Sequence, residues 1–185
     1  MSAIISECEK YRYALTRSNS NPSDSQWSSI VFLMLNPSTA DDVKPDPTVT
    51  RLKGFIDAWG VNGLIVVNLF AFRASKPKVM LAAHKEGIDI IGPKNDAFIR
   101  ELCAFKNVVC AWGANAHAQD RVEHVLKLLD EVGAQTWCMG VNDDGSPKHP
   151  LYLKGDTQLQ PYPTPVKQRR FTPVISTDNP NSDLF

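Results

Sequence analysis

The sequence predicts an α/β domain of three layers, with a mainly parallel central sheet covered by helices on both faces. Three observations predict this fold: continuous apolar runs recur along the chain, they lack the polar–apolar alternation of half-exposed strands, and helical patterns separate them. Strands that are buried on both faces of a parallel sheet have this composition. One domain over 1–159 accounts for these elements, and the Pro-rich segment 160–185 is expected to form a disordered, mobile tail.

The predicted elements alternate between strand and helix. We expect an edge strand at 9–17, buried strands at 30–35, 63–70, 107–113 and 134–141, helices at 47–59, 93–105 and 114–133, a loop with a short helix at 71–87, and a turn-rich loop at 143–156. The first helix follows Asp46 with Pro47 in its first turn, and it ends at Gly60. The last helix has apolar residues at helical spacing from Val122 to Leu129.

Composition limits the function classes. The 185 residues are 43% hydrophobic, which suits one domain with a core. Because 20 Lys and Arg balance 20 Asp and Glu, the chain is not strongly basic like many nucleic-acid-binding proteins, although a local basic patch can still meet phosphates. Four cysteines without a CxxC pair argue against a disulfide framework and structural zinc, and they indicate reduced thiols in a cytoplasmic protein.

Membrane, cofactor and metal signals are weak. The N-terminal segment 1–17 has no long apolar stretch, unlike a signal peptide, and no segment approaches the roughly 20 apolar residues of a membrane span. Because GxxxxGK[ST] and GxGxxG are absent, no cofactor is predicted. His84, His117 and His124 lack HExxH-like spacing, and the acidic segment 41–46 is more typical of helix and loop stabilisation, so no metal site is predicted.

Polar residues stand at the carboxyl ends of the predicted strands. Asn36 follows the first buried strand, Asn68 lies near the end of the second, Trp112-Gly113 ends the third, and His149-Pro150 lies in the loop after the fourth. In open parallel sheets, ligands bind beyond the carboxyl ends of the strands. The pattern therefore predicts a site that gathers these residues at one rim of the sheet.

Each of these residues also has an ordinary structural interpretation. Asn36-Pro37 is equally typical of a turn that ends a strand. The buried amide of Asn68 needs hydrogen-bond partners, which either the backbone or a ligand can supply. His149 is either a solvated loop histidine or a group that faces developing negative charge, and Arg73 is either an exposed loop charge or a ligand for an anion at the rim.

Several segments together resemble a known family. YRYALTR, FLMLNPSTAD, DPTVTRLKGFIDAWG, VVNLFAFRASKP and CAWGANA are similar to the domain-of-unknown-function family numbered 1643, found in bacteria and phages. The similarity extends over about residues 9–155. It groups the chain with this family but implies no activity.

A more distant resemblance, to the uracil-DNA glycosylase superfamily, implies a parallel α/β sheet and a base-binding site. Asn36-Pro37 in MLNPS takes the place of the motif whose carboxylate or amide positions the attacking water. Asn68 in VVNL takes the place of an asparagine that reads the base edge. The sequence WGANA, with Trp112 and Gly113, is similar to a motif that ends a later strand.

The last motif of that superfamily resembles KHPLYL. Here His149 would face the base oxygen, with Pro150 and Leu151 in a loop that enters the duplex. Two features depart from the pattern: Ser-Thr-Ala-Asp follows Asn36-Pro37, and Leu151 stands where a serine is expected. An aromatic that stacks on the base is also missing after the first motif, and Phe70 or Phe72 is the nearest substitute.

The resemblance implies a glycosylase-like enzyme that acts on a base in DNA, or on a nucleoside or nucleotide. DNA or a nucleotide is therefore the expected partner, and no interaction with a membrane is expected. Asn36 and His149 would be catalytic. The substrate-binding residues would be Pro37, Asn68, Phe70, Arg73, Trp112, Gly113, Pro150 and Leu151. A non-catalytic module that binds nucleic acid or a nucleotide is an alternative, because an amide replaces the carboxylate of the first motif. A metal-assisted small-molecule hydrolase that uses the segment 41–46 is a third.

Overall fold

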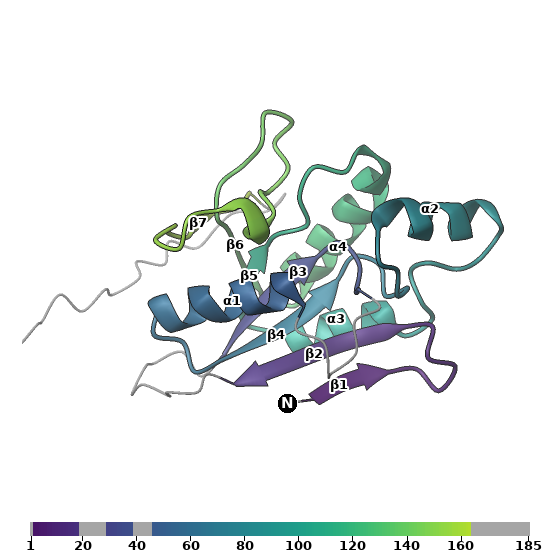
Figure 1. The fold of residues 1–185 in the computed structure, drawn as a ribbon, viewed down its shortest axis with the longest axis horizontal. Helices are drawn as coiled ribbons and strands as arrows, with labels where there is room; N and C mark the ends of the chain where they lie inside the picture. Colours follow the sequence, from purple (N-terminus) through teal and green to yellow (C-terminus); the bar gives the residue numbers. More distant parts are fainter. Residues whose placement is uncertain (1, 19–28, 39–45, 164–185) are drawn as a thin grey trace, which may run out of the picture.

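The computed structural model describes residues 2–18, 29–38 and 46–163. Within these residues, one seven-stranded sheet has the order β1-β2-β4-β3-β5-β6-β7 (Figure 1). The strands are β1 (Ser2–Ile5), β2 (Arg12–Ser18), β3 (Ile30–Met34), β4 (Gly63–Asn68), β5 (Asn107–Cys110), β6 (Gln135–Cys138) and β7 (Gln160–Pro161). The helices are α1 (Pro47–Ala58), α2 (Pro77–Lys85), α3 (Asn95–Cys103) and α4 (Gln119–Glu131), with short 3₁₀ turns η1 (Ala116–Ala118) and η2 (Pro150–Tyr152). The predicted α/β class is confirmed.

The four central strands, β4, β3, β5 and β6, are parallel, whereas β1, β2 and β7 join the sheet in antiparallel orientation. Met34 of β3 lies beside Asn68 of β4, and Leu33 lies beside Cys110 of β5. The carboxyl ends of the central strands therefore share one rim of the sheet, as the sequence predicts.

Helices cover both faces of the sheet (Figure 1). On one face, α1 buries Leu52, Phe55 and Ile56 against a cluster that includes Phe32 of β3 and Leu64 of β4. The other cluster contains apolar residues of α2, α3 and α4 and the alternate residues of the same strands. Because each central strand is apolar on both of its sides, the three-layer arrangement removes both faces from water.

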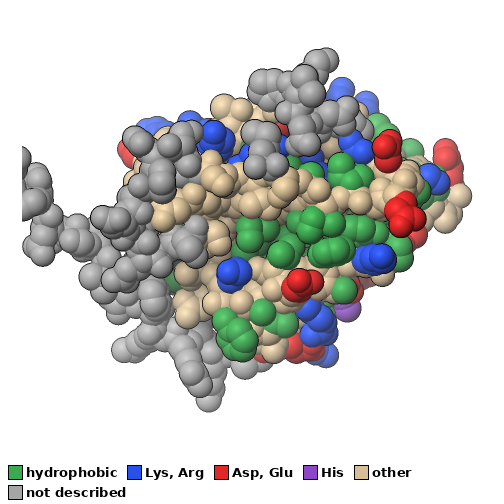
Figure 2. All heavy atoms as spheres, turned by 90° about the horizontal axis from the view of Figure 1, so that it is seen from below, with side chains coloured by type: hydrophobic (Ala, Val, Ile, Leu, Met, Phe, Trp, Pro, Cys, Tyr) green, Lys and Arg blue, Asp and Glu red, His purple; other side chains and the backbone are tan. Residues whose placement is uncertain are grey.

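The antiparallel edge next to β2 differs from the prediction. A strand is predicted at 9–17 as the edge, but β1 lies outside β2 and is the outer strand among the described residues. Ile4 and Ile5 of β1 are 40% and 42% exposed. Figure 2, which views the molecule from below, shows a band of hydrophobic side chains between scattered charges. The segment SAII has only four residues, so it is too short to be recognised without its partner strand.

The carboxyl-terminal boundary also needs correction. The tail is predicted to begin at 160, but β7 pairs with β6, and Tyr162 is buried with its ring edge-to-face against Trp112 at 5.6 Å between centroids. The domain therefore continues through residue 163, and 164–185 lie outside the described residues. Among the described helices, none is long and apolar enough to cross a membrane.

Candidate functional site: the crevice between β3 and β5

The strand order makes a topological switch point at this rim. From β3 the chain passes through α1 to β4 on one side, and it later returns through α2 and α3 to β5 on the other side of β3. The segments that leave β3 and β5 therefore depart toward opposite faces of the sheet. Such a switch point is where open α/β sheets bind ligands. We call the region between the carboxyl ends of β3 and β5 the switch-point crevice.

Asn36 lies two residues beyond β3 and is half-buried. Its Nδ2 donates to the carbonyl oxygens of Pro37 at 3.1 Å and Ala74 at 2.9 Å. These bonds fix the amide plane and tie the end of β3 to the loop after β4. Its Oδ1 makes no hydrogen bond to the described residues and remains an acceptor.

Asn68 ends β4 and is only 2% exposed. Its side-chain Nδ2 is buried and has no hydrogen-bond partner among the described residues, a costly condition for an amide. The backbone around it is held firmly, because Asn95 of α3 donates from Nδ2 to the carbonyl oxygens of Asn68 and Leu69, each at 3.1 Å. Asn36 and Asn68 thus follow neighbouring parallel strands at the same rim.

His149 reaches the crevice through Gly113. A Cβ atom added to Gly113 would lie 3.3 Å from the Cβ of His149, and Gly113 has a φ of +75°. Leu33 and Cys110 are the last paired residues of β3 and β5, and Asn36 and Gly113 each lie three residues beyond them in the sequence. The loop after β6 therefore brings His149 to the crevice.

The imidazole of His149 has a defined polarity. Its Nδ1 accepts a hydrogen bond from the Leu151 N–H at 3.3 Å, so a neutral ring carries its proton on Nε2. Burial lowers the pKa of His149 below its usual value, and the Asp46 carboxylate opposes this shift. Nε2 makes no hydrogen bond to the described residues. The crevice thus holds a neutral imidazole with an uncommitted N–H donor.

Asp46 is a second polar group at this rim. Its Oδ1 caps α1 by accepting from the N–H of Thr48 at 2.7 Å and of Val49 at 3.4 Å, and its Oδ2 accepts from Ser38 Oγ at 2.6 Å. The predicted role of Asp46 at a helix N-terminus is confirmed. The remainder of the acidic segment, 41–45, lies outside the described residues.

Three predicted substrate-binding side chains lie elsewhere. Trp112 is 4% exposed and packs in the core cluster opposite α1, against Tyr162. Phe70 belongs to the same cluster and lines a cavity on that face. The guanidinium of Arg73 donates to the Glu9 carbonyl at 3.0 Å and braces the turn between β1 and β2. Packing and backbone bonding engage these side chains, and their contact with a ligand at the rim stays a prediction.

The remaining predicted residues surround His149 or Asn36. Pro37 and Pro150 are buried and shape the backbone beside each of them. Leu151 is 38% exposed and borders a shallow hollow with Arg51 of α1. Arg51 in turn donates to the Leu153 carbonyl, which docks η2 on α1.

Sequence reasoning overlooked a cavity of about 620 Å³ under α2, α3 and α4. We call it the α2–α4 cavity; His84, His117 and His124 line it, with Phe70, Asp96 and Arg121. No group of three or more His, Cys, Asp or Glu in the described ranges is arranged to hold a metal ion. Separate segments carry these histidines, so their sequence spacing gave no sign of the cavity.

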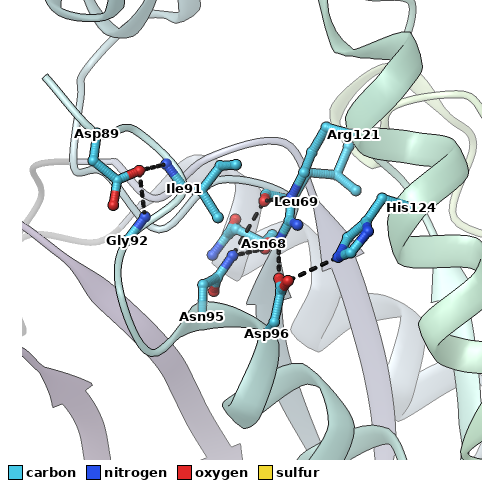
Figure 3. A network of polar contacts seen from close by, with 9 residues as sticks. All are labelled: Asn68, Leu69, Asp89, Ile91, Gly92, Asn95, Asp96, Arg121 and His124. Atoms are coloured by element: carbon cyan, nitrogen blue, oxygen red, sulfur yellow. Dashed lines mark hydrogen bonds and ion pairs between the residues drawn. The ribbon is translucent and has the colours of Figure 1, made fainter. Parts of the chain in front are cut away.

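A polar network lies beside this cavity (Figure 3). Arg121 of α4 donates from Nε to the Leu69 carbonyl at 2.7 Å and from Nη2 to Asp96 at 2.5 Å, and His124 Nε2 lies 2.8 Å from the other oxygen of Asp96. Burial raises the pKa of Asp96, but hydrogen bonds from Arg121 and His124 outweigh it and leave the pKa below its usual value. The spacing of Arg121 and His124, three residues apart on one helix, was the available sequence signal.

Comparison with known proteins identifies one family. A family model described as "Protein of unknown function (DUF1643)" matches residues 12–151, which confirms the first resemblance read from the sequence. No significant match was found among curated proteins or among solved structures.

Proposed function

The chain belongs to this family of unknown function, and we propose from its crevice that it hydrolyses the N-glycosidic bond of a base in DNA, or in a nucleoside or nucleotide. One observation carries the proposal: a neutral histidine, His149, lies at the switch point with its Nε2–H uncommitted. The N–H of a neutral imidazole donates a hydrogen bond to developing negative charge. The departing base is the group that acquires such charge.

The reaction places one water against the sugar. As the C1′–N bond breaks, its electron pair leaves with the base, and the water oxygen forms the new bond to C1′. A proton from the water ends on the departing base, so the products are the free base and the sugar hydroxyl. Asn36 Oδ1 is the acceptor proposed to orient this water, because its Nδ2 is already anchored to Pro37 and Ala74. An amide takes no proton, so most of the rate enhancement falls to charge stabilisation by His149.

Asn68 is proposed to recognise the base edge. Its buried Nδ2 lacks a partner among the described residues, and a carbonyl acceptor on the base would remove that cost. The more distant resemblance to uracil-DNA glycosylases also implies roles for Asn36 and Asn68 at strand ends. That resemblance supports the reaction class, and the uncommitted atoms support the roles.

Base release tests the proposal. Purified protein is incubated with oligonucleotides that contain uracil or hypoxanthine and with free nucleosides, and liberated base is measured by chromatography. We expect release by the wild type and a loss of about 10²-fold or more in His149→Ala, the effect typical of a lost oxyanion donor. Asn36→Ala is expected to slow release as well. Lys127→Ala, on α4 and exposed, serves as the folded control and should match the wild type. Equal rates for His149→Ala and the control would remove the role given to this histidine.

A second candidate function is nucleic-acid binding without catalysis. One observation favours it: Tyr152 on η2 is 85% exposed beside His149, and Lys148 and Lys154 are exposed in the same loop. Exposed aromatic rings stack on bases, and neighbouring lysines meet phosphates. Gel-shift titration with single-stranded DNA at increasing salt would show weaker binding in Tyr152→Ala. Phe105→Ala, at an aromatic residue that is 88% exposed, is the matched control. Salt-sensitive binding without base release would select this function.

A further inference from the structure

The α2–α4 cavity has the size and walls of a small-molecule site. Its volume of about 620 Å³ falls within the roughly 300–1,000 Å³ typical of ligand pockets. Apolar side chains, including Phe70, Leu81 and Ile88, form much of its lining. It shares no lining residue with the crevice residues Asn36 and His149, and it lies on the face of the sheet opposite α1.

A buried cation with spare donors lines this cavity. Arg121 is 7% exposed, and its Nε and Nη2 are bonded to Leu69 and Asp96. Its Nη1 has no hydrogen bond to the described residues. This nitrogen is not fully shielded from solvent. Because Arg121 lines the cavity, the two N–H groups of Nη1 are open to an acceptor that enters it.

Acceptors lie in the same lining. Asp89 is held by the N–H groups of Ile91 and Gly92, both of which bond to its Oδ1, so its Oδ2 is left without a hydrogen bond among the described residues (Figure 3). Asp120 of α4 is exposed and has no ion pair or hydrogen bond there. A ligand that fills the cavity therefore meets both an uncommitted donor and uncommitted carboxylate oxygens.

Charge selects among ligands. An anion that accepts from Arg121 would lie among the three carboxylates of Asp89, Asp96 and Asp120. Repulsion between like charges and the loss of hydration both oppose its binding. A cation would be attracted by these carboxylates, but it would leave Nη1 of Arg121 unpaired and face its positive charge. A neutral ligand with a carbonyl oxygen next to an N–H group avoids both costs. We propose that the α2–α4 cavity binds a neutral heterocycle with such a lactam edge, whose ring packs on the apolar walls.

The four histidines make the proposal testable by NMR. His84, His117 and His124 line the cavity, whereas His149 lies at the crevice, so the imidazole resonances report which site a ligand occupies. Uridine and inosine, which carry the lactam edge, are titrated to millimolar concentration. We expect the three cavity rings to shift, whether or not a nucleoside also reaches His149 at the crevice. N3-methyluridine lacks the N–H group and is expected to bind at least about 10-fold more weakly, because an acceptor stays unpaired.

Two variants complete the test. Ile91→Trp fills the cavity from a residue that is 37% exposed, and Asp120→Asn removes an exposed carboxylate; both are expected to weaken uridine binding while the fold is retained. Equal affinity for uridine and N3-methyluridine, or shifts confined to His149, would overturn the proposal. Absence of any shift in the cavity rings would overturn it as well. Because the readout is binding at named rings, the result is independent of base release at the crevice.

Discussion

Gly113 provides a direct test of how His149 is held at the crevice. Gly113 and Gly145 both have positive φ, +75° and +79°, where an L-residue is strained by roughly 1–2 kcal/mol. Replacing glycine with alanine also restricts the unfolded chain, which offsets about 0.4–1 kcal/mol of this cost. Either alanine variant should therefore lose about 1 kcal/mol of unfolding free energy from backbone conformation alone.

Only one of these positions meets a neighbour. The added Cβ at Gly113 would lie 3.3 Å from the Cβ of His149, whereas nothing lies within 4 Å of that at Gly145. A contact this close is shorter than ordinary van der Waals packing, so the Cβ of His149 must shift by a few tenths of an ångström. Overpacking of this kind costs about 1–3 kcal/mol. We therefore expect Gly113→Ala to destabilise the domain by about 1 kcal/mol or more beyond Gly145→Ala.

Urea denaturation of the two variants measures this difference, and NMR of the imidazole resonances measures the displacement of His149. His149→Gly removes the opposing Cβ, so the extra cost of Gly113→Ala should largely disappear in that background. Equal stability of the two alanine variants within about 0.5 kcal/mol, together with an unchanged His149 resonance, would refute the close approach of Gly113 and His149.

Three further predictions concern the two faces of the sheet. Because the folded pKa of Asp96 is lowered, its contribution to stability is present above its unfolded pKa and is lost as pH falls through the folded one; urea denaturation at a series of acidic pH values should show a shallower loss for Asp96→Asn. Leu129 of α4 is fully buried, so Leu129→Ala should cost about 2–5 kcal/mol in the same assay. Gly54 lies inside α1 with open space around it, so Gly54→Ala should raise the unfolding free energy by up to about 1 kcal/mol.

The central sheet could be predicted because its strands are encoded locally. A run such as Ile30 to Leu35 is apolar on both sides, and only burial between two helical layers accounts for it. The strands that were missed or misplaced, β1 and β7, are four and two residues long. Their existence depends on pairing with a neighbour rather than on their own composition, so no local pattern could reveal them.

The candidate site was predicted unevenly for a related reason. Asn68 ends β4, and Asn36 and Gly113 lie two and three residues beyond β3 and β5, so parallel strands bring them to one rim. Side-chain direction was not encoded in the same way. Trp112 ends a predicted strand, yet it faces the core opposite α1, and Arg73 is drawn to the carbonyl of Glu9 across the sheet.

The α2–α4 cavity could not be predicted, because its lining comes from the end of β4, two connecting segments and three helices. Helical periodicity assigns Arg121 and Val122 of α4 alike to the buried side, but it does not indicate which partner neutralises the arginine. That partner, Asp96, belongs to another helix, and the carbonyl of Leu69 belongs to a strand end. Only the packing of α3 against α4 brings them together.

The end of β4 links the crevice and the cavity. Asn68 contributes a buried amide near the crevice, the Leu69 carbonyl accepts from both Asn95 and Arg121, and Phe70 lines the cavity. Three consecutive residues thus lie at the rim of the sheet, in the polar network and at the cavity in turn. Since Arg121 and Asn95 hold this backbone from α4 and α3, any ligand that draws the guanidinium away from Leu69 removes one of the two donors to its carbonyl. The Leu69 carbonyl then keeps only Asn95 as a side-chain donor, while the Leu69 N–H still donates to the Met34 carbonyl of β3.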